Sequence, residues 1–341
     1  MRNRILSPLV IAFALAGCSG AREATSLPSA PAQSGAAAAV APAPNAKKPP
    51  PQGMYLASRD TAQILGFAPG ATGNAAPTTV IAGANTKLVD PVALAVDAAG
   101  NLYAANDSAK QILIFPAGSN GNVTPKMLSG SKLGLTATNG IAIDAAGEIY
   151  VSDFIADQIL VFAAGASGNV APVRTISGAS TLLTSPVGMA FDAAGNLYVA
   201  NYGDAYNAIV EFAPGATGNA TPAGTLGGPA STLVGPLNVS VTPAGFIIAG
   251  NVSTEAIDIF KKGAGGNVHP DTIISGASTT IGQVTTTGID AQGNIYATNF
   301  VQSTGYDVLV FAAKAKNNAA PLRTLSGGST SIDDPFYPVF H

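Results

Sequence analysis

Short apolar runs and turn-forming segments alternate along the chain from residue 54 onward. One stretch shows the pattern clearly, with apolar runs at 140–143, 148–152, 158–162 and 173–176. These runs are rich in β-branched and aromatic residues, and segments such as Asp144-Ala145-Ala146-Gly147 separate them, which predicts strands joined by turns. Because the runs are apolar at successive rather than alternate positions, we expect sheets that are covered on both faces.

Two landmarks repeat along this stretch. The segment Asp-Ala-Ala-Gly-Asn-Leu-Tyr at 97–103 returns in close variants at 144–150, 192–198 and 290–296, and in a degenerate form at 242–245. The glycines of these segments lie 47, 48, 50 and 48 residues apart. A Phe that is followed seven residues later by Asn, and after three more by Pro, occurs six times, at Phe67, Phe115, Phe162, Phe212, Phe260 and Phe311. The chain therefore contains six copies of one unit of about 48 residues.

Each copy contains four short strands, and four-stranded sheets packed face to face around an axis form a propeller. The first copy begins at Met54, and Tyr55 aligns with Tyr103, so this copy lacks its innermost strand. Residues 335–340 align with 91–96 and would supply the missing strand. We therefore predict an all-β, six-bladed β-propeller over residues 54–341, with four-stranded blades and a composite closing blade made from N- and C-terminal strands.

The segment Gly-Ile-Ala-Ile-Asp-x-x-Gly-x-Ile-Tyr-Val-Ser-Asp at 140–153, followed by Gln-Ile-Leu-Val-Phe at 158–162, resembles the NHL repeat. The resemblance covers nearly all of 54–341. This chain departs from the usual pattern in its longer period, in an inserted Gly-x-x-Gly-Asn-x-x-Pro arm, and in having Asn more often than Asp after the second strand. NHL-like propellers serve as scaffolds, sensors and occasionally enzymes, so the resemblance implies the fold far more than a reaction.

The first 53 residues differ from the rest. Arg2 and Arg4 precede an apolar stretch at 5–14 that is too short for a permanent membrane span. Leu15-Ala16-Gly17-Cys18 resembles a bacterial lipobox, so we predict a lipoprotein signal peptide at 1–17, a lipidated Cys18, and an Ala/Pro-rich tether without a core over 18–53. Ser19 follows the cysteine, and the resemblance then favours the outer membrane. We expect an exported, lipid-anchored protein, and the sequence leaves open whether it lies on the periplasmic or the surface face of that membrane.

Composition narrows the classes of function. The chain has 16 Lys and Arg against 19 Asp and Glu, and charged residues make up only 10% of it, which argues against a nucleic-acid partner. A single cysteine and two histidines, His269 and His341, exclude a disulfide within the chain and a Cys-rich zinc site. We therefore expect no cofactor, with Ca²⁺ as the alternative.

One polar residue follows the second strand of every copy. These residues are Ser58, Asn106, Asp153, Asn201, Asn251 and Asn299. They could form a ring that binds a cation or a sugar. Because all six copies have such a residue, we expect each side chain to cap the loop that follows it by bonding local backbone.

Residues that bind a ligand should break the sixfold symmetry. The distance from this polar residue to the Phe of the third strand is nine residues in four copies, but eleven from Asn201 and twelve from Asn299. Candidate ligand-binding residues in these loops and at the matching position of a third copy are Phe154, Tyr202, Asp204, Tyr206, Phe300, Tyr306 and Asp307. Aromatic rings flanked by polar groups suit a glycan or a peptide. The alternative is that the rings pack within their own loops.

Three acidic residues, Asp90, Asp333 and Asp334, lie in predicted loops between copies on the same face and are weak candidates for a Ca²⁺ site. Solvated turns before Pro91 and Pro335 are the favoured interpretation. The metal ligands of gluconolactonase-like propellers have no match in this chain, and His269 lies in a repeated turn.

We therefore predict a noncatalytic binding or scaffold module for a protein, peptide or glycan at the cell envelope, with contact to the membrane only through the lipid. The alternatives are a metal-dependent hydrolase or lyase of the gluconolactonase-like type and a purely structural surface protein.

Overall fold

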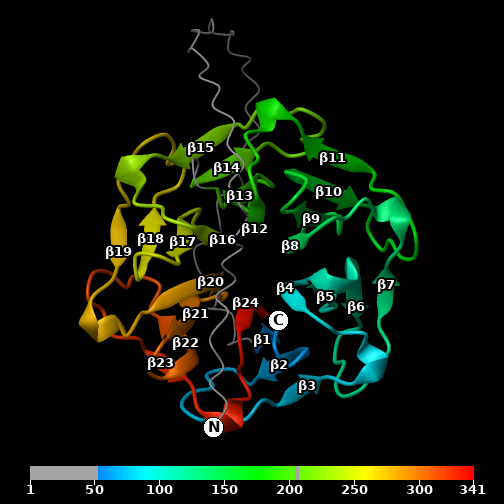
Figure 1. Cartoon of the computed structure of the whole chain (residues 1–341). Coiled ribbons are helices and arrows are strands. Elements are labelled where there is room, and N and C mark those ends of the chain that lie inside the picture. Colours follow the sequence, from blue (N-terminus) through cyan, green and yellow to red (C-terminus); the bar gives the residue numbers. More distant parts are fainter. Residues whose placement is uncertain (1–52, 204–206) are drawn as a thin grey trace, which may run out of the picture. The chain divides into compact units, whose positions relative to one another are not determined.

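The computed structural model describes residues 53–203 and 207–341, which form a ring of six antiparallel sheets with four strands each (Figure 1). The predicted all-β, six-bladed propeller is confirmed, including a closing blade that combines strands from both ends of the described chain. The predicted signal peptide, Cys18 and residues 19–52 of the predicted tether lie outside the described residues. Within the described part, no helix is long and apolar enough to cross a membrane.

Blade 1 consists, from the axis outward, of β24 (Pro335–Phe340), β1 (Met54–Ser58), β2 (Gln63–Phe67) and β3 (Thr79–Ile81). Blade 2 has β4 (Pro91–Val96), β5 (Leu102–Asn106), β6 (Gln111–Phe115) and β7 (Lys126–Leu128), and blade 3 has β8 (Thr138–Ile143), β9 (Ile149–Asp153), β10 (Gln158–Phe162) and β11 (Arg174–Ser177). Blade 4 has β12 (Pro186–Phe191), β13 (Leu197–Asn201), β14 (Ala208–Phe212) and β15 (Gly224–Gly227). Blade 5 has β16 (Pro236–Val241), β17 (Ile247–Asn251), β18 (Ala256–Phe260) and β19 (Thr272–Ile274), and blade 6 has β20 (Gln283–Ile289), β21 (Ile295–Val301), β22 (Gly305–Phe311) and β23 (Arg323–Leu325).

Short 3₁₀ helices lie in the loops between the strands. Six of them follow the outermost strand of a blade, at Ala84–Thr86, Ser131–Leu133, Ala179–Thr181, Pro229–Ser231, Ala277–Thr279 and Gly328–Thr330. A seventh, Asp107–Ala109, lies between β5 and β6. The six inter-blade loops and the loops between second and third strands share one side of the ring. The turns between first and second strands lie on the opposite side.

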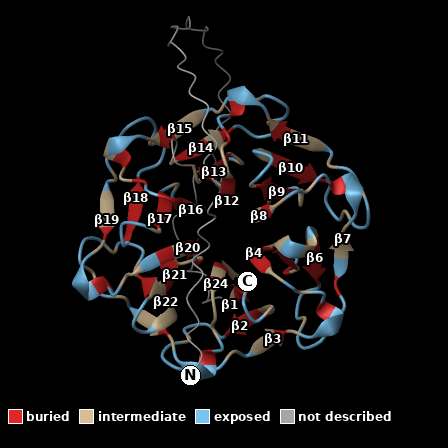
Figure 2. Ribbon diagram, in the orientation of Figure 1, coloured by how far each residue is buried: buried red, intermediate tan, exposed pale blue. Residues whose placement is uncertain are grey.

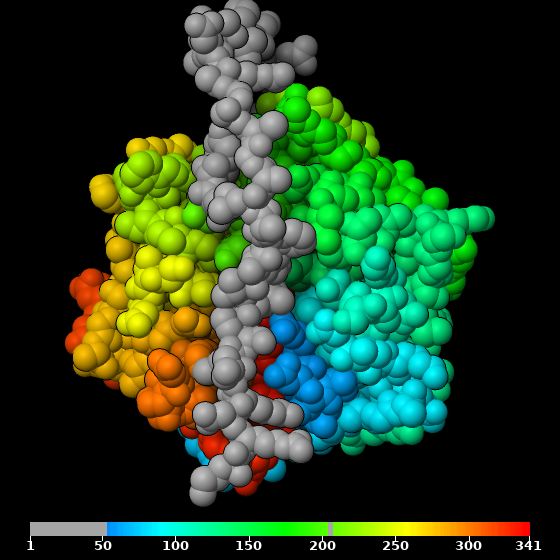
Figure 3. Space-filling model, viewed as in Figure 1, coloured from blue at the N-terminus to red at the C-terminus, as the bar shows by residue number. Residues whose placement is uncertain are grey.

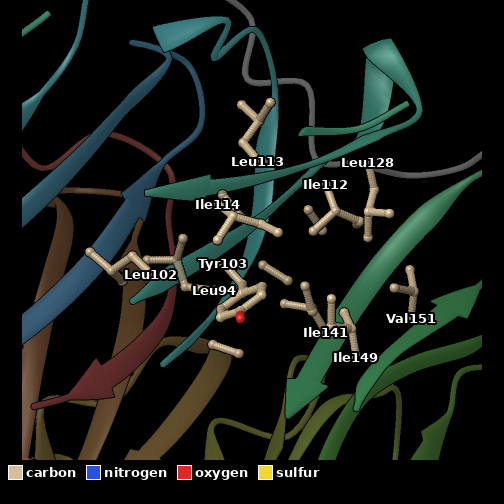
Figure 4. Packing of buried hydrophobic residues seen from close by; sticks show 14 of the residues in the cluster. Leu94, Leu102, Tyr103, Ile112, Leu113, Ile114, Leu128, Ile141, Ile149 and Val151 are labelled. Carbon is tan, nitrogen blue, oxygen red and sulfur yellow. The ribbon is translucent and has the colours of Figure 1, made fainter. Parts of the chain in front are cut away.

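Both faces of the sheets pack against neighbouring sheets, as the continuous apolar runs predicted. One buried cluster joins Ile112 and Leu128 of blade 2 to Ile149 and Val151 of blade 3 (Figure 4). The Phe that ends each third strand is 2% exposed or less in every blade. Truncating a side chain of this kind costs about 3–5 kcal/mol. Buried residues therefore concentrate in the strands, while the loops around the rim are exposed (Figure 2).

The arm between the third and fourth strands reaches from each blade to the blade before it. A residue of the arm forms an isolated parallel bridge with the outermost strand of that neighbour at all six junctions: Gly73 with Leu325, Gly121 with Ile81, Gly168 with Leu128, Gly218 with Ile176, Gly266 with Leu226, and Asn317 with Ile274. Each bridge has a short backbone hydrogen bond, as from Gly218 N to the Thr175 carbonyl oxygen at 2.6 Å. The inserted arm thus forms a belt around the outside of the ring.

The repeated Asn of the sequence landmark fastens this belt. Its side-chain oxygen accepts a hydrogen bond, 2.7–2.8 Å long, from a backbone N–H of the 3₁₀ helix in the preceding inter-blade loop, at Asn74, Asn122, Asn169, Asn219, Asn267 and Asn318. The glycine before that helix makes room: Gly178 has φ of 116°, and a Cβ atom there would lie 2.6 Å from the Asn219 oxygen. The spacing from Phe to Asn therefore encodes contacts between blades.

The ring closes without a covalent bond. In blade 1, β1 pairs with β24, joining Met54 to Phe340 and Ser58 to Pro335, and the Gly53 N–H donates to the His341 carbonyl oxygen at 3.2 Å. The space-filling view shows the first and last described strands side by side (Figure 3). The belt closes as well, since Asn74 accepts from Ser329 N at 2.7 Å.

We predict that Asn74→Ala opens blade 1 locally, whereas Asn219→Ala does not. Each change removes two hydrogen bonds, one accepted from a backbone N–H and one donated to a serine hydroxyl, each worth about 0.5–1.5 kcal/mol. Of these two Asn residues, only Asn74 joins segments from opposite ends of the described chain, so the loss of its bonds should raise sub-global opening of β1. Amide hydrogen exchange of β1 should be faster in Asn74→Ala than in the wild type. Thr217→Ala, an exposed change in the arm of blade 4, is the control, and unchanged protection of β1 in Asn74→Ala would contradict the prediction.

Candidate functional site

Tyr337 of the closing strand crosses the axis of the propeller. Its side chain is 5% exposed, and its hydroxyl donates to the Asn139 carbonyl oxygen at 3.3 Å. A Cβ atom on Gly188 would lie 2.7 Å from the same hydroxyl oxygen. Asn139 belongs to β8 and Gly188 to β12, so the ring of Tyr337 reaches from blade 1 to blades 3 and 4 on the far side.

The other inner strands leave room for this side chain. At the position aligned with Tyr337 they carry Ala93, Gly140, Gly188, Asn238 and Thr286. Tyr337 lies at a register shift in the pairing of β24 with β1 and has φ of 49°, a conformation that costs a bulky residue of order 1–3 kcal/mol. Its N–H donates to Thr286 Oγ1 at 2.8 Å. The structure thus holds a strained residue in the axial channel.

A buried polar network surrounds the Tyr337 hydroxyl. Ser240 Oγ donates to the Thr287 carbonyl oxygen at 2.9 Å, and Thr287 Oγ1 donates to Asn238 Oδ1 at 3.2 Å. Burial raises the pKa of Tyr337 well above its usual range, although a hydrogen bond from the Asn238 side chain opposes the shift. Tyr337 therefore stays neutral and acts as a fixed plug.

Next to this plug the channel contains a funnel-shaped cavity of about 570 Å³, the axial funnel, with Tyr337 at its closed end. It opens on the side of the turns between first and second strands, and the last residues of all six inner strands line it. Its wall includes the half-buried apolar residues at the ends of the inner strands, Val96, Ile143, Phe191, Val241, Ile289 and Phe340. Leu94, Ile141, Met189 and Val239 border it as well, but their side chains are buried. Asn238, Ser240, Thr287 and Tyr337 form its polar floor. This shape and lining are typical of a preformed ligand site.

Two carboxylates, Asp192 and Asp290, line the axial funnel, and Asp290 is 3% exposed. The aspartate that opens each repeated turn is Asp97, Asp144, Asp192 and Asp290 in blades 2, 3, 4 and 6. Burial acts to raise the pKa of Asp97, but hydrogen bonds from Asn101, Tyr103 and Ala99 outweigh it and hold that pKa below its usual range. In blade 5 the turn begins with Thr242, and Phe246 is 41% exposed. The repeated turn therefore begins with an aspartate in four blades and with a threonine in blade 5.

The six polar residues after the second strands are buried, at 0–1% exposure. The predicted capping role is confirmed: Asn106 Oδ1, for example, accepts from Val89 N at 2.9 Å and Asp90 N at 3.1 Å. The prediction was wrong about which loop is capped, because the main partners lie in the inter-blade loop before the blade. The end of the second strand lies beside that loop, and sequence order hides this.

The structure does not bring the predicted aromatic residues into one site. The rings of Phe154 and Tyr202 lie 6.4 Å apart at the junction of blades 3 and 4. Those of Phe300 and Tyr306 lie 4.9 Å apart in blade 6, on the other side of the ring. All four are half-buried, and the predicted residues Asp204 and Tyr206 lie outside the described residues.

Asp307 is also held within its own blade. Asn299 Nδ2 donates to Asp307 Oδ1 at 2.9 Å, and burial raises the pKa of Asp307 to about 6 against this opposing bond. This carboxyl therefore faces a neighbouring side chain of blade 6.

Arg59 lies between two of the three candidate calcium ligands. Its Nε is 3.4 Å from Asp90 Oδ1 and 3.1 Å from Asp334 Oδ2, while the Asp333 carbonyl oxygen accepts from Ser58 Oγ. Burial raises the pKa of Asp334 to about 6 despite Arg59. Within residues 53–203 and 207–341, no three His, Cys, Asp or Glu side chains group so as to hold a metal ion.

Asp258 of β18 is an unusual buried carboxyl that the sequence analysis missed. It is 1% exposed and occupies the position of Leu113 and Leu160 in other blades. Its Oδ2 accepts from Asn251 Nδ2 at 2.7 Å and Thr232 Oγ1 at 2.8 Å, whereas Oδ1 has no partner among the described residues. Burial raises the pKa of Asp258 to about 6, against the hydrogen bonds from Thr232 and Asn251. Alignment of the copies could have revealed it, since it is the one charged residue at this position.

The chain matches no known family model and no curated protein sequence. Among solved structures, a Bacteroides caccae protein of unknown function has TM-score 0.60 at 10% identity, over 85% of this chain and 99% of that one. A chain of the nidogen/laminin complex has TM-score 0.61 at 14% identity, over 85% and 98%. A candidate 6-phosphogluconolactonase from Bacteroides uniformis has TM-score 0.55 at 16% identity, over 84% of each chain. At these identities the likeness concerns the propeller fold alone.

We predict that Asp258→Leu stabilises the protein at neutral pH by about 1–3 kcal/mol. The Asn251 amide can then donate to the Thr232 carbonyl oxygen, as Asn106 does to that of Lys87 at 2.9 Å. Because the folded pKa of about 6 lies above the ordinary value of 3.8, the folded state binds the proton more tightly. The ionisation of Asp258 therefore lowers the free energy of unfolding of the wild type increasingly as the pH rises from about 4 through about 6.

Chemical denaturation at pH 4 and pH 7 checks this sign. The increase in the free energy of unfolding that Asp258→Leu causes should be larger at pH 7 than at pH 4. Asp258→Asn is the matched control, since it removes the charge but keeps a buried polar group. It should make the free energy of unfolding less dependent on pH, and it should raise that free energy less than Asp258→Leu does. A gain for Asp258→Leu that does not change with pH would contradict the assignment.

Proposed function

We propose that the chain is an exported, lipid-anchored propeller that acts as a noncatalytic binding or scaffold module for a protein, peptide or glycan at the cell envelope. The observation that carries the proposal is the axial funnel, a preformed cavity of about 570 Å³ with an apolar wall and a polar floor. Such cavities are the usual place for a ligand in a rigid fold.

Preorganisation supports this choice of site. The funnel is built from strands rather than loops, and each inner strand is hydrogen-bonded to a second strand of its blade. Two aromatic wall residues are fixed by ring contacts: Phe191 lies 5.0 Å from the Tyr150 ring and Phe340 lies 4.6 Å from the Tyr296 ring. A ligand therefore would not have to order these side chains, which lowers the cost of binding.

The place where the chain leaves the propeller suits an anchored module. Gly53, the first described residue, bonds to His341, and the imidazole of His341 packs against Gly100 in the turn after β4. That turn borders the mouth of the axial funnel. A tether running from here to a lipidated Cys18 would start on the funnel side of the ring.

Anchoring is tested by metabolic labelling with a clickable fatty acid. We expect the wild type to be labelled and Cys18→Ser to be unlabelled, because the thiol accepts the diacylglycerol. Ser19→Asp is the matched control, which should keep the label but shift from the outer to the inner membrane fraction. Equal labelling of wild type and Cys18→Ser would refute lipidation.

Binding is tested with two variants on opposite sides of the ring. Ala190 is half-buried and lines the axial funnel, so Ala190→Phe should fill part of it and reduce retention on immobilised envelope peptides and glycans at least about fivefold. Tyr202→Ala with Tyr306→Ala changes the opposite side and should leave retention unchanged. The reverse pattern would move the site to the loops between second and third strands. Thermal unfolding confirms that each variant is folded.

A further inference from the structure

We propose that the axial funnel takes a polypeptide segment whose apolar side chains are flanked by Lys or Arg, with the apolar part against the wall and the basic part at the mouth. This inference rests on the proposed function, because it takes the funnel as the ligand site. It adds the chemical class of the ligand.

The wall selects apolar groups. The half-buried residues at the ends of the inner strands are apolar, and at the floor Asn238, Ser240 and Thr287 bond one another. Apolar ligand atoms that pack against these apolar side chains are removed from water, which is worth roughly 25 cal/mol per Å².

The mouth selects positive charge. Among the described residues that line the axial funnel, the charged ones are Asp192 and Asp290, both negative. Each accepts hydrogen bonds from backbone N–H groups of its own turn, as Asp192 Oδ1 does from Ala194 N and Asn196 N at 2.9 Å. Asp192 is half-buried, whereas Asp290 is 3% exposed. Asp97 and Asp144 begin the equivalent turns of blades 2 and 3. Carboxylates arranged around one opening add their potentials and attract a cationic ligand.

Three basic residues on this side of the ring, Arg174, Arg323 and Lys261, have partners among the described residues, and Arg323 Nη2 donates to the Tyr296 hydroxyl at 2.9 Å. Arg174 pairs with Glu148, with Nη1 and Oε1 3.0 Å apart, and Lys261 Nζ lies 3.8 Å from Asp271. Lys262 packs against Gly245 in the turn of blade 5, the blade whose turn begins with Thr242 instead of an aspartate. The mouth therefore has a direction, with carboxylates on blades 2, 3, 4 and 6 and a lysine on blade 5.

The inner strands favour a polypeptide over a glycan. Each of the six is an edge strand that pairs with only one neighbour, so its other edge faces the channel. Edge strands offer backbone N–H and C=O groups that a peptide main chain can meet. The polar side chains of the floor already hydrogen-bond one another, so few of them are left to bond the hydroxyl groups of a sugar.

Peptide fluorescence tests the inference without labelling, because the chain contains no tryptophan. The probe is a synthetic peptide with an apolar centre of alanine, leucine and one tryptophan, and with two lysines at each end. On titration with the folded protein, its emission should shift to the blue and saturate. Its affinity should fall at least about fivefold between ~50 and ~500 mM NaCl, because salt screens exposed charges.

Two matched peptides separate the chemical requirements. Replacing the lysines with glutamates should weaken binding at least about tenfold, and replacing the apolar residues with serines around the same tryptophan should abolish the blue shift. Equal binding of the glutamate peptide would overturn the charge requirement. Equal binding of the serine-centred peptide would overturn the apolar one.

Variants of the protein place the binding in the funnel. Ala190→Lys should weaken binding of the lysine-flanked peptide more than Ala190→Leu does, since both side chains fill space but only lysine adds a positive charge. Asp192→Asn should weaken it severalfold, with Asp290→Asn as the substitute if that variant does not fold. Asp60→Asn, an exposed change on the opposite side, should have no effect. Binding that is indifferent to every funnel variant would overturn the assignment.

The two proposals can fail separately. If no peptide binds but retention on envelope glycans still depends on Ala190, the polypeptide class is wrong and the funnel remains the ligand site. If retention and peptide binding are both unaffected at Ala190, the funnel itself is wrong.

Discussion

The structure depends on the closure of a ring whose sheets are apolar on both faces. A blade with two apolar faces needs a neighbour on each side, so an open row of blades would expose two unmatched surfaces. The pairing of β1 with β24 removes those ends, and the outer belt repeats the closure where Gly73 meets Leu325. Contacts at the inner and outer edges of the blades therefore act together on the same junction.

Closure also determines the candidate site. The strand that completes blade 1 carries Tyr337, and this side chain divides the axial channel and forms the floor of the funnel. The cost of placing a bulky residue at φ of 49° is met by its contacts with Thr286, Asn139 and Gly188. A strained residue held this firmly is typical of a functional position. The closure of the ring and the geometry of the candidate site therefore both depend on the six residues of β24, Pro335–Phe340.

Much of the fold was predictable, because the repeat period turns one local pattern into six. Asn219 marked the belt through its spacing from Phe212, although only the structure shows that its partner is Ser180 in the preceding loop. The funnel was not predictable in the same way. Tyr337 bonds Asn139 across 198 residues of sequence, and such a contact follows from the diameter of the closed ring rather than from any periodicity. The loop aromatics were prominent in sequence, yet Phe154 and Tyr202 contact each other instead of surrounding a cavity.

Symmetry separates two kinds of position in this chain, those kept in all six blades and those that differ between blades. Positions kept in all six blades, such as the belt Asn and the capping residue after the second strand, are engaged in holding loops and neighbours together. Departures from symmetry at the inner strands, by contrast, gather on the axis: Tyr337 and Asn238 replace small residues there, and Thr242 replaces an aspartate at the mouth. These substitutions come from different blades but border one cavity. Asp258 of β18 and the longer loops after Asn201 and Asn299 also break the symmetry, but they lie in separate places, whereas the exceptions on the inner strands border the cavity for which we propose a ligand.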